Sequence, residues 1–230
     1  RTIHYFLGFL HFELGEYHEA ISYLQIAKNS EFTELTSLFY LGYAYLKTKD
    51  YDAALPQFNL LYEKASKLEG SMSLSKPVEA QYGGFMSLGE ILAMALWGKA
   101  FTNAERDTIL QEALNHVQKA LDYIDALLKS ESPVHFLAHC MDCKGWILLK
   151  MGKIDEAIPL LRQAVSLSSN PEGYLHLALA YERKLQASGD NADLLHEIQV
   201  CCQHVQELDV RKEYEQQVNE ILRRHPEKSQ

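Results

Sequence analysis

The sequence predicts an all-α solenoid of about five helical hairpins followed by a C-terminal capping helix. Apolar residues recur at helical spacing along the chain, and no run alternates apolar and polar residues as a strand would. A short pattern also returns after 34 residues, which is a period typical of stacked helical repeats. The 230 residues, 47% of them hydrophobic, suffice to bury a core.

The repeat consists of a glycine followed twelve residues later by an alanine, and it occurs in three segments. The pairs are Gly8 with Ala20, Gly42 with Ala54, and Gly145 with Ala157. Small residues at both positions allow the two helices of a hairpin to approach closely. We therefore expect a bulky replacement at one of these glycines to overpack the junction by about 1–3 kcal/mol.

The first two units are expected at about 1–34 and 35–76, with helices at 2–14, 17–29, 34–47 and 51–68. Gly15 offers a left-handed stop after the first helix. Asp50 is placed to cap the start of the fourth helix. Residues 70–77 are rich in glycine, serine and proline, so they predict a longer loop.

The third unit, at about 77–132, departs from the regular period. We expect one oversized hairpin here, with helices near 78–100 and 105–129 and Asn103 in the turn between them. This irregular hairpin distinguishes the chain from a uniform stack of repeats. A specific function is therefore expected to reside there.

The fourth and fifth units are expected at about 133–170 and 171–209, with helices at 134–151, 154–167, 171–187 and 192–208. Asn170 before Pro171 marks the start of the third of these helices. A last amphipathic segment at about 210–225 carries many charges, which suits a solvent-facing cap. The whole chain, 1–230, is expected to form a single solenoid domain.

Composition argues against several classes of function. The net charge of −9 and the lack of a basic stripe disfavour a nucleic-acid partner. The longest apolar run, 91–97, is too short to span a bilayer. Arg1 falls directly inside a repeat, so we expect the chain to be a piece of a longer protein. The four cysteines are poorly spaced for disulfides, which favours a reducing, cytoplasmic location.

Motifs for catalysis are missing from the sequence, so we expect no enzyme and no cofactor. There is no glycine-rich phosphate loop, nucleophile elbow or HExxH pair. His135, His139 and Cys143 share one helix face and are the candidates for a metal site. One helix rarely supplies the four ligands that zinc prefers, so buried apolar cysteines without a metal are the expected alternative.

The recurring residues resemble the tetratricopeptide repeat family, whose signature places Leu-Gly, Tyr, Ala, an aromatic and Ala in a 34-residue helical hairpin. The first, second and fourth units match this signature well, and the third and fifth match it in part. The resemblance implies a right-handed superhelix whose first helices line a concave groove. The matching groove positions are Tyr5, Phe9, Phe12, Phe39, Tyr43, Lys47, Asp142, Trp146, Lys150, Leu175 and Leu179.

These positions suggest a protein-interaction scaffold or adaptor that binds an extended or helical peptide segment of a partner. Aromatic side chains in a concavity are typical anchors for such a segment, although the same spacing also suits core packing. One branch of the family holds a peptide's C-terminal carboxylate with lysines and asparagines. The matching places here are aromatic, so a cationic clamp of that kind is not expected.

Two further hypotheses remain open. The irregular third hairpin, with its 70–77 loop, suits a regulatory sensor that responds to a small ligand or peptide. Alternatively, copies of the chain could assemble by stacking end to end, as repeat units do within one chain. Neither hypothesis identifies the partner.

Overall fold

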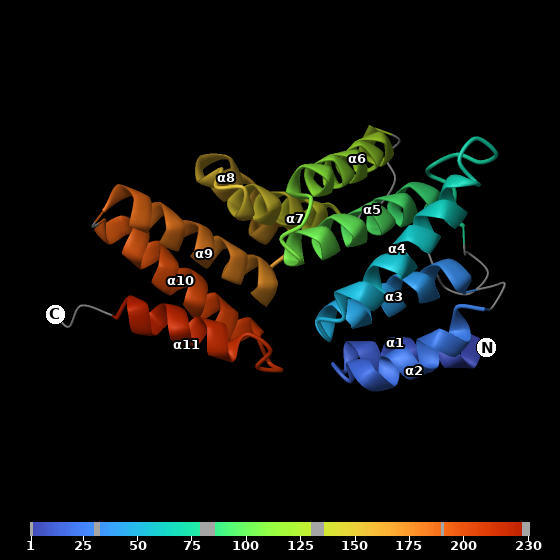
Figure 1. Cartoon of the computed structure of the whole chain (residues 1–230), viewed down its shortest axis with the longest axis horizontal. Coiled ribbons are helices and arrows are strands. Elements are labelled where there is room, and N and C mark those ends of the chain that lie inside the picture. The colour runs from blue at the N-terminus through green and yellow to red at the C-terminus, as the bar shows by residue number, and fades with distance from the viewer. Residues whose placement is uncertain (1, 30–32, 79–85, 130–135, 190, 227–230) are drawn as a thin grey trace. The chain divides into compact units, whose positions relative to one another are not determined.

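A computed structural model of the chain describes residues 2–29, 33–78, 86–129, 136–189 and 191–226. Within these residues it contains eleven α-helices and no strand, which confirms the all-α prediction. The chain divides into two compact units, Arg1–Cys140 and Met141–Gln230, which we call the N-terminal and C-terminal units (Figure 1). None of the helices in the described ranges is long and apolar enough to cross a bilayer.

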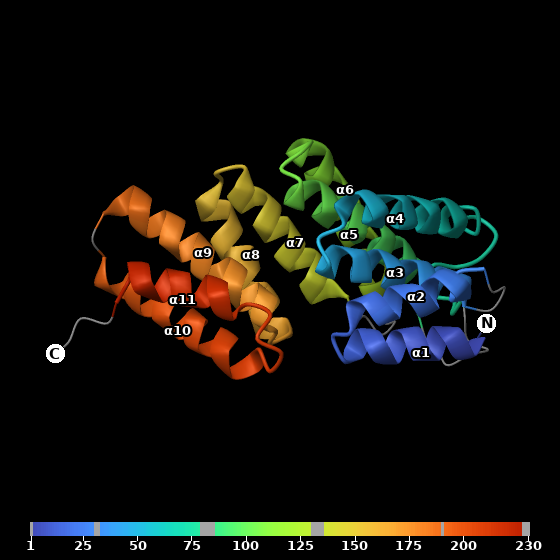
Figure 2. The same cartoon turned by 60° about the horizontal axis from the view of Figure 1, so that its bottom comes forward.

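The N-terminal unit consists of three helical hairpins. Their helices are α1 (Thr2–Glu13), α2 (Tyr17–Ala27), α3 (Glu34–Lys47), α4 (Tyr51–Ser66), α5 (Leu88–Glu105) and α6 (Leu110–Lys129). The two helices of each hairpin lie side by side (Figure 2), and the first helices also touch one another, α1 with α3 and α3 with α5. This row of first helices, α1, α3 and α5, positions the candidate site.

The hairpins close tightly at the repeat glycines, as the sequence predicts. A Cβ atom at Gly8 would lie 2.6 Å from the Leu24 side chain, and one at Gly42 would lie 2.8 Å from the Phe58 ring. The partner alanines, Ala20 and Ala54, are fully buried. Small residues at these positions therefore set the distance between the paired helices.

The third hairpin differs from its prediction at both helix starts. The first helix, α5, begins at Leu88 instead of near residue 78, and residues 79–85 lie outside the described ranges. A capping box fixes this start: the Ser87 hydroxyl accepts from the Glu90 N–H at 3.3 Å, and the Glu90 carboxylate accepts from the Ser87 N–H at 3.4 Å. The preceding loop, predicted at 70–77, is confirmed by turns and by backbone hydrogen bonds that its carbonyls accept from the first turn of α5.

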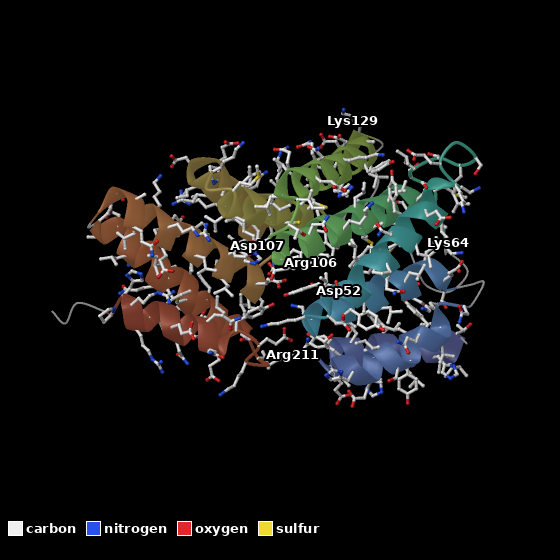
Figure 3. The ribbon with its side chains drawn as sticks, in the orientation of Figure 1. Asp52, Lys64, Arg106, Asp107, Lys129 and Arg211 are labelled. Atoms are coloured by element: carbon white, nitrogen blue, oxygen red, sulfur yellow. The ribbon has the colours of Figure 1, made fainter. Side chains whose placement is uncertain are left out.

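The turn predicted at Asn103 is wrong. Asn103 is buried inside α5, which continues to Glu105, and the true turn precedes Leu110. Apolar residues lie on every face of α5, so its sequence has no helical period that would mark where the helix ends. In the turn Ile109 adopts a φ of 50°, a left-handed conformation that is strained for a β-branched residue. Arg106 pairs with Asp52 at the start of α4 at 3.1 Å (Figure 3).

The C-terminal unit holds two hairpins and a final helix. Its helices are α7 (Leu137–Lys150), whose first turn belongs to the N-terminal unit, α8 (Ile154–Leu167), α9 (Pro171–Ser188), α10 (Ala192–Leu208) and α11 (Glu215–Arg224). A Cβ at Gly145 would lie 2.7 Å from Leu161, so the repeat junction recurs here. The Asn170 side chain accepts from the Gly173 N–H at 2.8 Å and caps α9 as predicted.

The last helix, α11, begins at Glu215, five residues after the predicted start at Val210. The carboxylate of Asp209 accepts backbone N–H bonds from Glu213 and Tyr214, at 2.9 and 2.7 Å, and this turn delays the helix. Only Val218 and Ile221 of α11 are buried. The remaining residues of the helix are exposed apart from half-buried Leu222, as suits a capping helix.

An ion-pair cluster fastens α11 to α9. The buried carboxylate of Glu182 accepts two hydrogen bonds from Arg224, at 2.7 and 3.0 Å, and one from His225 at 2.8 Å. Burial by itself raises the pKa of Glu182, but the hydrogen bonds from Arg224 and His225 outweigh it and hold this pKa below its ordinary value. The cluster therefore favours the charged carboxylate and with it the docked helix.

Candidate functional site

A continuous cluster of aromatic side chains runs across the first helices of the N-terminal unit. Its members, which we call the aromatic ladder, are Tyr5, Phe9, Phe12, Phe39, Tyr40, Tyr43, Trp97, Phe101 and Phe136. Ring centroids are 5.0 Å apart for Phe9 and Tyr40, and 5.1 Å apart for Tyr43 and Trp97. These separations and the mostly edge-to-face angles are those that aromatic pairs prefer.

The ladder has an inner and an outer layer. Phe12, Phe39, Trp97 and Phe101 are buried and form the inner layer. The outer layer is half-buried and comprises Tyr5, Phe9, Tyr40, Tyr43 and Phe136. The buried rings contact Tyr40, Tyr43 and Phe136 of the outer layer, so these three rings would lose little side-chain entropy on binding a partner.

Two polar groups modify this apolar face. Burial, with smaller contributions from Tyr5 and Glu13, raises the pKa of Tyr40, so its phenol stays protonated at physiological pH. The Lys47 ammonium lies 5.7 Å from the centroid of the Tyr43 ring, within cation–π range. Lys47 therefore adds a positive charge to an aromatic surface that also has the carboxylate of Glu13 close to Tyr40.

The six groove residues predicted in this unit all lie on α1 and α3. Tyr5, Phe9, Tyr43 and Lys47 are half-buried, whereas Phe12 and Phe39 are buried beneath neighbouring rings. The ring centroids of Phe12 and Tyr43 are 5.1 Å apart, and those of Phe39 and Trp97 are 6.1 Å apart.

Sequence reasoning missed four members of the ladder, Tyr40, Trp97, Phe101 and Phe136. Trp97 is the centre of the ladder, with ring contacts to Tyr43, Phe101 and Phe136. Trp97 ends the apolar run 91–97, and this run was the signal in the sequence. Because the helices of the third hairpin were predicted at the wrong residues, the helix face on which Trp97 lies could not be assigned. Tyr40 could have been found from its position three residues before Tyr43, which places the two side chains near one face of the helix.

The predicted residues of the C-terminal unit form a second, smaller cluster. The Trp146 ring stacks on His176 with centroids 4.3 Å apart, and the Lys150 ammonium lies 4.9 Å from the Trp146 centroid. Both carboxylate oxygens of Asp142 lie 3.0 Å from Nδ1 of His176, which is 34 residues, one period, further along the chain. Leu175 is buried and Leu179 half-buried on α9. Asp142 and Leu175 thus pack inside the unit, and Trp146 and Lys150 are its partly accessible members.

Two of the three candidate metal residues, His139 and Cys143, lie on α7 within the described ranges. His135 lies outside the described residues, His139 stacks on Phe136 at 4.9 Å, and Cys143 is a buried thiol. Among the described residues no group of three histidine, cysteine or acidic side chains could hold a metal ion. All four cysteines are buried thiols.

Comparison with known protein families finds matching repeats in two parts of the chain. Two models of the tetratricopeptide repeat family match, one over residues 10–68 and one over residues 144–171. The first match covers most of the first two hairpins, and the second covers the second half of α7 and all of α8. No curated protein sequence matches the chain.

Several solved structures share the fold. A thermophilic tetratricopeptide repeat protein of Thermus thermophilus is 18% identical with a TM-score of 0.62, and the match covers 95% of this chain and 97% of that one. The Rap conjugation gene regulator of plasmid pLS20, solved with the Phr* peptide, is 14% identical with a TM-score of 0.71; the match covers 98% of this chain and 58% of that one. Repeats of a kinesin light chain from Podosopora anserina are 18% identical with a TM-score of 0.53, covering 86% and 92%. At these identities the likeness concerns the fold alone.

Proposed function

Because the chain belongs to the tetratricopeptide repeat family, we propose that it is a protein-interaction scaffold that binds a peptide segment of a partner on the first-helix face of its N-terminal unit. The observation that carries the proposal is the outer layer of the aromatic ladder. Among these half-buried rings, Tyr43 packs against the buried rings of Phe12 and Trp97. Tyr5 and Phe9 offer further apolar surface and pack against Tyr40. Such anchors dominate the binding energy of many protein interfaces.

The chemistry of this face defines the segment that it would take. Aromatic rings favour a peptide with apolar side chains, in an extended or helical conformation. Lys47 adds a positive charge beside Tyr43, so an acidic residue next to the apolar anchor would be tolerated there. Two or more spaced apolar residues are therefore the minimal recognition element.

A structural neighbour gives a reason to test peptides first. The Rap regulator of plasmid pLS20 was solved in complex with a peptide. Nearly the whole of this chain resembles part of the Rap regulator in fold. The likeness concerns the fold alone, so the peptide-binding role comes to this chain only as a proposal. The proposed role is binding and involves no chemical step.

The C-terminal unit offers a second contact region for the same kind of ligand. Trp146 and Lys150 are partly accessible, and the stacked ring of His176 holds the indole in place. We assign this cluster a supporting role, because it presents one accessible aromatic ring where the N-terminal unit presents several. Separate substitutions distinguish the two regions.

A peptide library displayed on phage and selected on the purified chain tests the proposal. Affinities of the selected peptides are then measured by fluorescence anisotropy for the wild type and for Tyr43→Ala and Trp146→Ala. We expect Tyr43→Ala to weaken binding by about tenfold or more, as loss of an interface anchor does. Leu128→Ala, on an exposed residue of α6, is the matched control and should bind like the wild type. Unchanged binding in both aromatic variants, with helical content intact, would contradict the proposal.

The sensor hypothesis stays a prediction. It requires ligand-dependent protection of residues 78–129 in hydrogen exchange, because the irregular third hairpin would have to move or become ordered when a ligand binds. Protection confined to α1 and α3 on adding a selected peptide would favour the static scaffold.

A further inference from the structure

A cluster of basic side chains lies between the helices α4, α5 and α6 and uses none of the rings of the aromatic ladder. Tyr62 comes from α4, Lys99 from α5, and His116 and Lys119 from α6, and we call these four residues the basic cluster. His116 and Lys119 are three residues apart, so their side chains lie near one face of α6. Three helices of the N-terminal unit therefore contribute to the cluster.

Lys99 has an unusual position in α5. The helix is buried from Leu88 to Ala104 except at Lys99, which is half-buried. The Lys99 ammonium lies 5.3 Å from the centroid of the Tyr62 ring, and it forms no ion pair among the described residues. The ring offsets part of the free energy of taking an ammonium out of water, and an anion would offset more of it.

Lys119 adds a second positive charge at the same tyrosine, and both lysines act on His116. The Lys119 ammonium donates a hydrogen bond to the Tyr62 hydroxyl at 2.7 Å. Burial is the main cause that lowers the pKa of His116, followed by the charge of Lys99 and, more weakly, that of Lys119, whereas the Glu112 carboxylate acts in the opposite direction. His116 is therefore neutral at pH 7 and could take up a proton when a negative charge binds nearby.

Two carboxylates border the cluster without neutralising the lysines directly. The two oxygens of Glu69 accept from the Tyr123 hydroxyl at 2.9 and 3.1 Å, and Oε1 of Glu112 lies 3.8 Å from Nε2 of His116. Glu69 attracts Lys119 electrostatically, but in the described part of the chain neither carboxylate forms an ion pair with a lysine of the cluster. In a chain with a net charge of −9, two lysines beside one tyrosine and outside any ion pair are available to an external anion.

We propose that the basic cluster is a binding site for a phosphate group, held by the ammonium groups of Lys99 and Lys119. Two lysines match the charge of a phosphate dianion, whereas a carboxylate would compensate only one of them. Lysine binds phosphate as a point charge and so needs no fixed fork geometry. The inference does not rest on the proposed peptide binding, because no residue of the basic cluster belongs to the aromatic ladder. Free phosphate and a phosphorylated side chain share this chemistry.

Titration of His116, followed by NMR of its imidazole, tests the site. The groups are partly open to water, so we expect a dissociation constant on the order of millimolar and use about 20 mM phosphate. Phosphate should raise the pKa of His116 above its value in sodium chloride of the same ionic strength, since the bound dianion offsets the charge of the two lysines. Equal His116 titration curves in phosphate and in chloride would overturn the proposal.

Charge-removing variants locate the phosphate. Lys99→Gln should weaken phosphate binding by about tenfold or more and should itself raise the pKa of His116 in chloride. Lys119→Gln, on an exposed side chain that can be replaced without disturbing the core, should also weaken binding. Lys67→Gln on α4, whose side chain is 68% exposed, removes the same charge outside the cluster and should respond like the wild type. Equal phosphate binding in all three variants would contradict the site.

Two further ligands identify the source and the charge of the anion. N-acetyl-phosphoserine amide binding at least as tightly as inorganic phosphate would assign the site to a phosphorylated side chain, and binding of inorganic phosphate alone would assign it to the free anion. Acetate that shifts His116 as strongly as phosphate would contradict the preference for a dianion. Tyr43→Ala should leave the phosphate response intact, and Lys99→Gln should leave peptide binding intact, so either proposal can fail without the other.

Discussion

Replacing Gly98 by alanine should destabilise the N-terminal unit, because Gly98 lies directly against the ring of Phe58. A Cβ atom at this position would lie 2.2 Å from Cδ1, 2.3 Å from Cε1 and 2.4 Å from Cγ of that ring. Carbon atoms in ordinary contact are about 3.5–4.0 Å apart, so the ring would have to move by more than about 1 Å. Phe58 is fully buried, and on α3 the Cβ position of Gly42 lies 2.8 Å from the same ring.

The effect of Gly98→Ala on the free energy of unfolding is the difference between a steric cost and a gain in helix propensity. Overpacking of a well-filled core costs about 1–3 kcal/mol, and this clash belongs at the upper end of that range. Alanine in a helix interior gains about 1 kcal/mol over glycine. We expect Gly98→Ala to lower the free energy of unfolding by about 2 kcal/mol. Gly89→Ala should be nearly neutral, since its Cβ would meet only the flexible end of Leu127 at 3.1 Å.

Urea unfolding monitored by the fluorescence of Trp97, in a Trp146→Phe background, measures this effect in the N-terminal unit. Phe58→Leu supplies the diagnostic second substitution, because leucine occupies the equivalent position in the first and fourth units. If the clash with the Phe58 ring is the cause, Gly98→Ala should lower the free energy of unfolding by less in the Phe58→Leu background than in the wild type. The coupling energy should be about 1 kcal/mol or more. Strict additivity of the two substitutions, or a Gly98→Ala protein as stable as the wild type, would refute the reasoning.

Three further predictions follow from local geometry and protonation. Ile109→Gly should stabilise the chain by about 1 kcal/mol, since it relieves a left-handed conformation at an exposed residue; a lower urea midpoint would contradict this. Glu182→Gln should speed proteolysis of α11 at pH 7, and its difference from the wild type should shrink as the pH falls below about 4.3, because a lowered pKa gives stability that is lost on protonation. A difference that persists at low pH would argue against this role of the carboxylate. Burial raises the pKa of Cys201 to about 12 and that of Cys202, with burial again the main cause, to about 11. Iodoacetamide should therefore leave native thiols unmodified at pH 8 and label all four in urea, and labelling of the native protein would disprove their burial.

Much of the fold could be predicted because the repeat residues act locally. Gly8, Gly42 and Gly145 are small where two helices meet, and the same close approach recurs at each of them in the structure. Caps such as Asp50, whose side chain accepts from the Ala53 N–H at 3.1 Å, depend on neighbours within one turn. Such signals are visible in a single sequence.

The third hairpin could not be predicted in the same way. Its first helix, α5, is buried on all sides, so its apolar residues carry no helical period that would mark a face or an end. The capping box of Ser87 and Glu90 marks the start of α5 in the sequence. The glycine-, serine- and proline-rich loop at 70–77 instead favoured a start near residue 78. Asn103 suits a turn by propensity, but burial in the core overrides that preference.

The candidate site was therefore only partly predictable. The family positions identified Tyr5, Phe9 and Tyr43 on the first two hairpins, where the helix register was right. Trp97, which links Tyr43 to Phe101 and Phe136, comes from the hairpin whose register was wrong. Long-range packing between first helices decides which rings are buried and which stay accessible, and a sequence period does not encode it.

Site-specific photo-cross-linking tests the central claim most directly. A photoreactive phenylalanine analogue placed at residue 43 or at residue 128 is irradiated with a selected peptide in saturating amount. The account predicts that the peptide cross-links from position 43 on the first-helix face and not from position 128 on α6. Cross-linking from position 128 with none from position 43 would contradict the claim that the aromatic face of the N-terminal unit is the binding site.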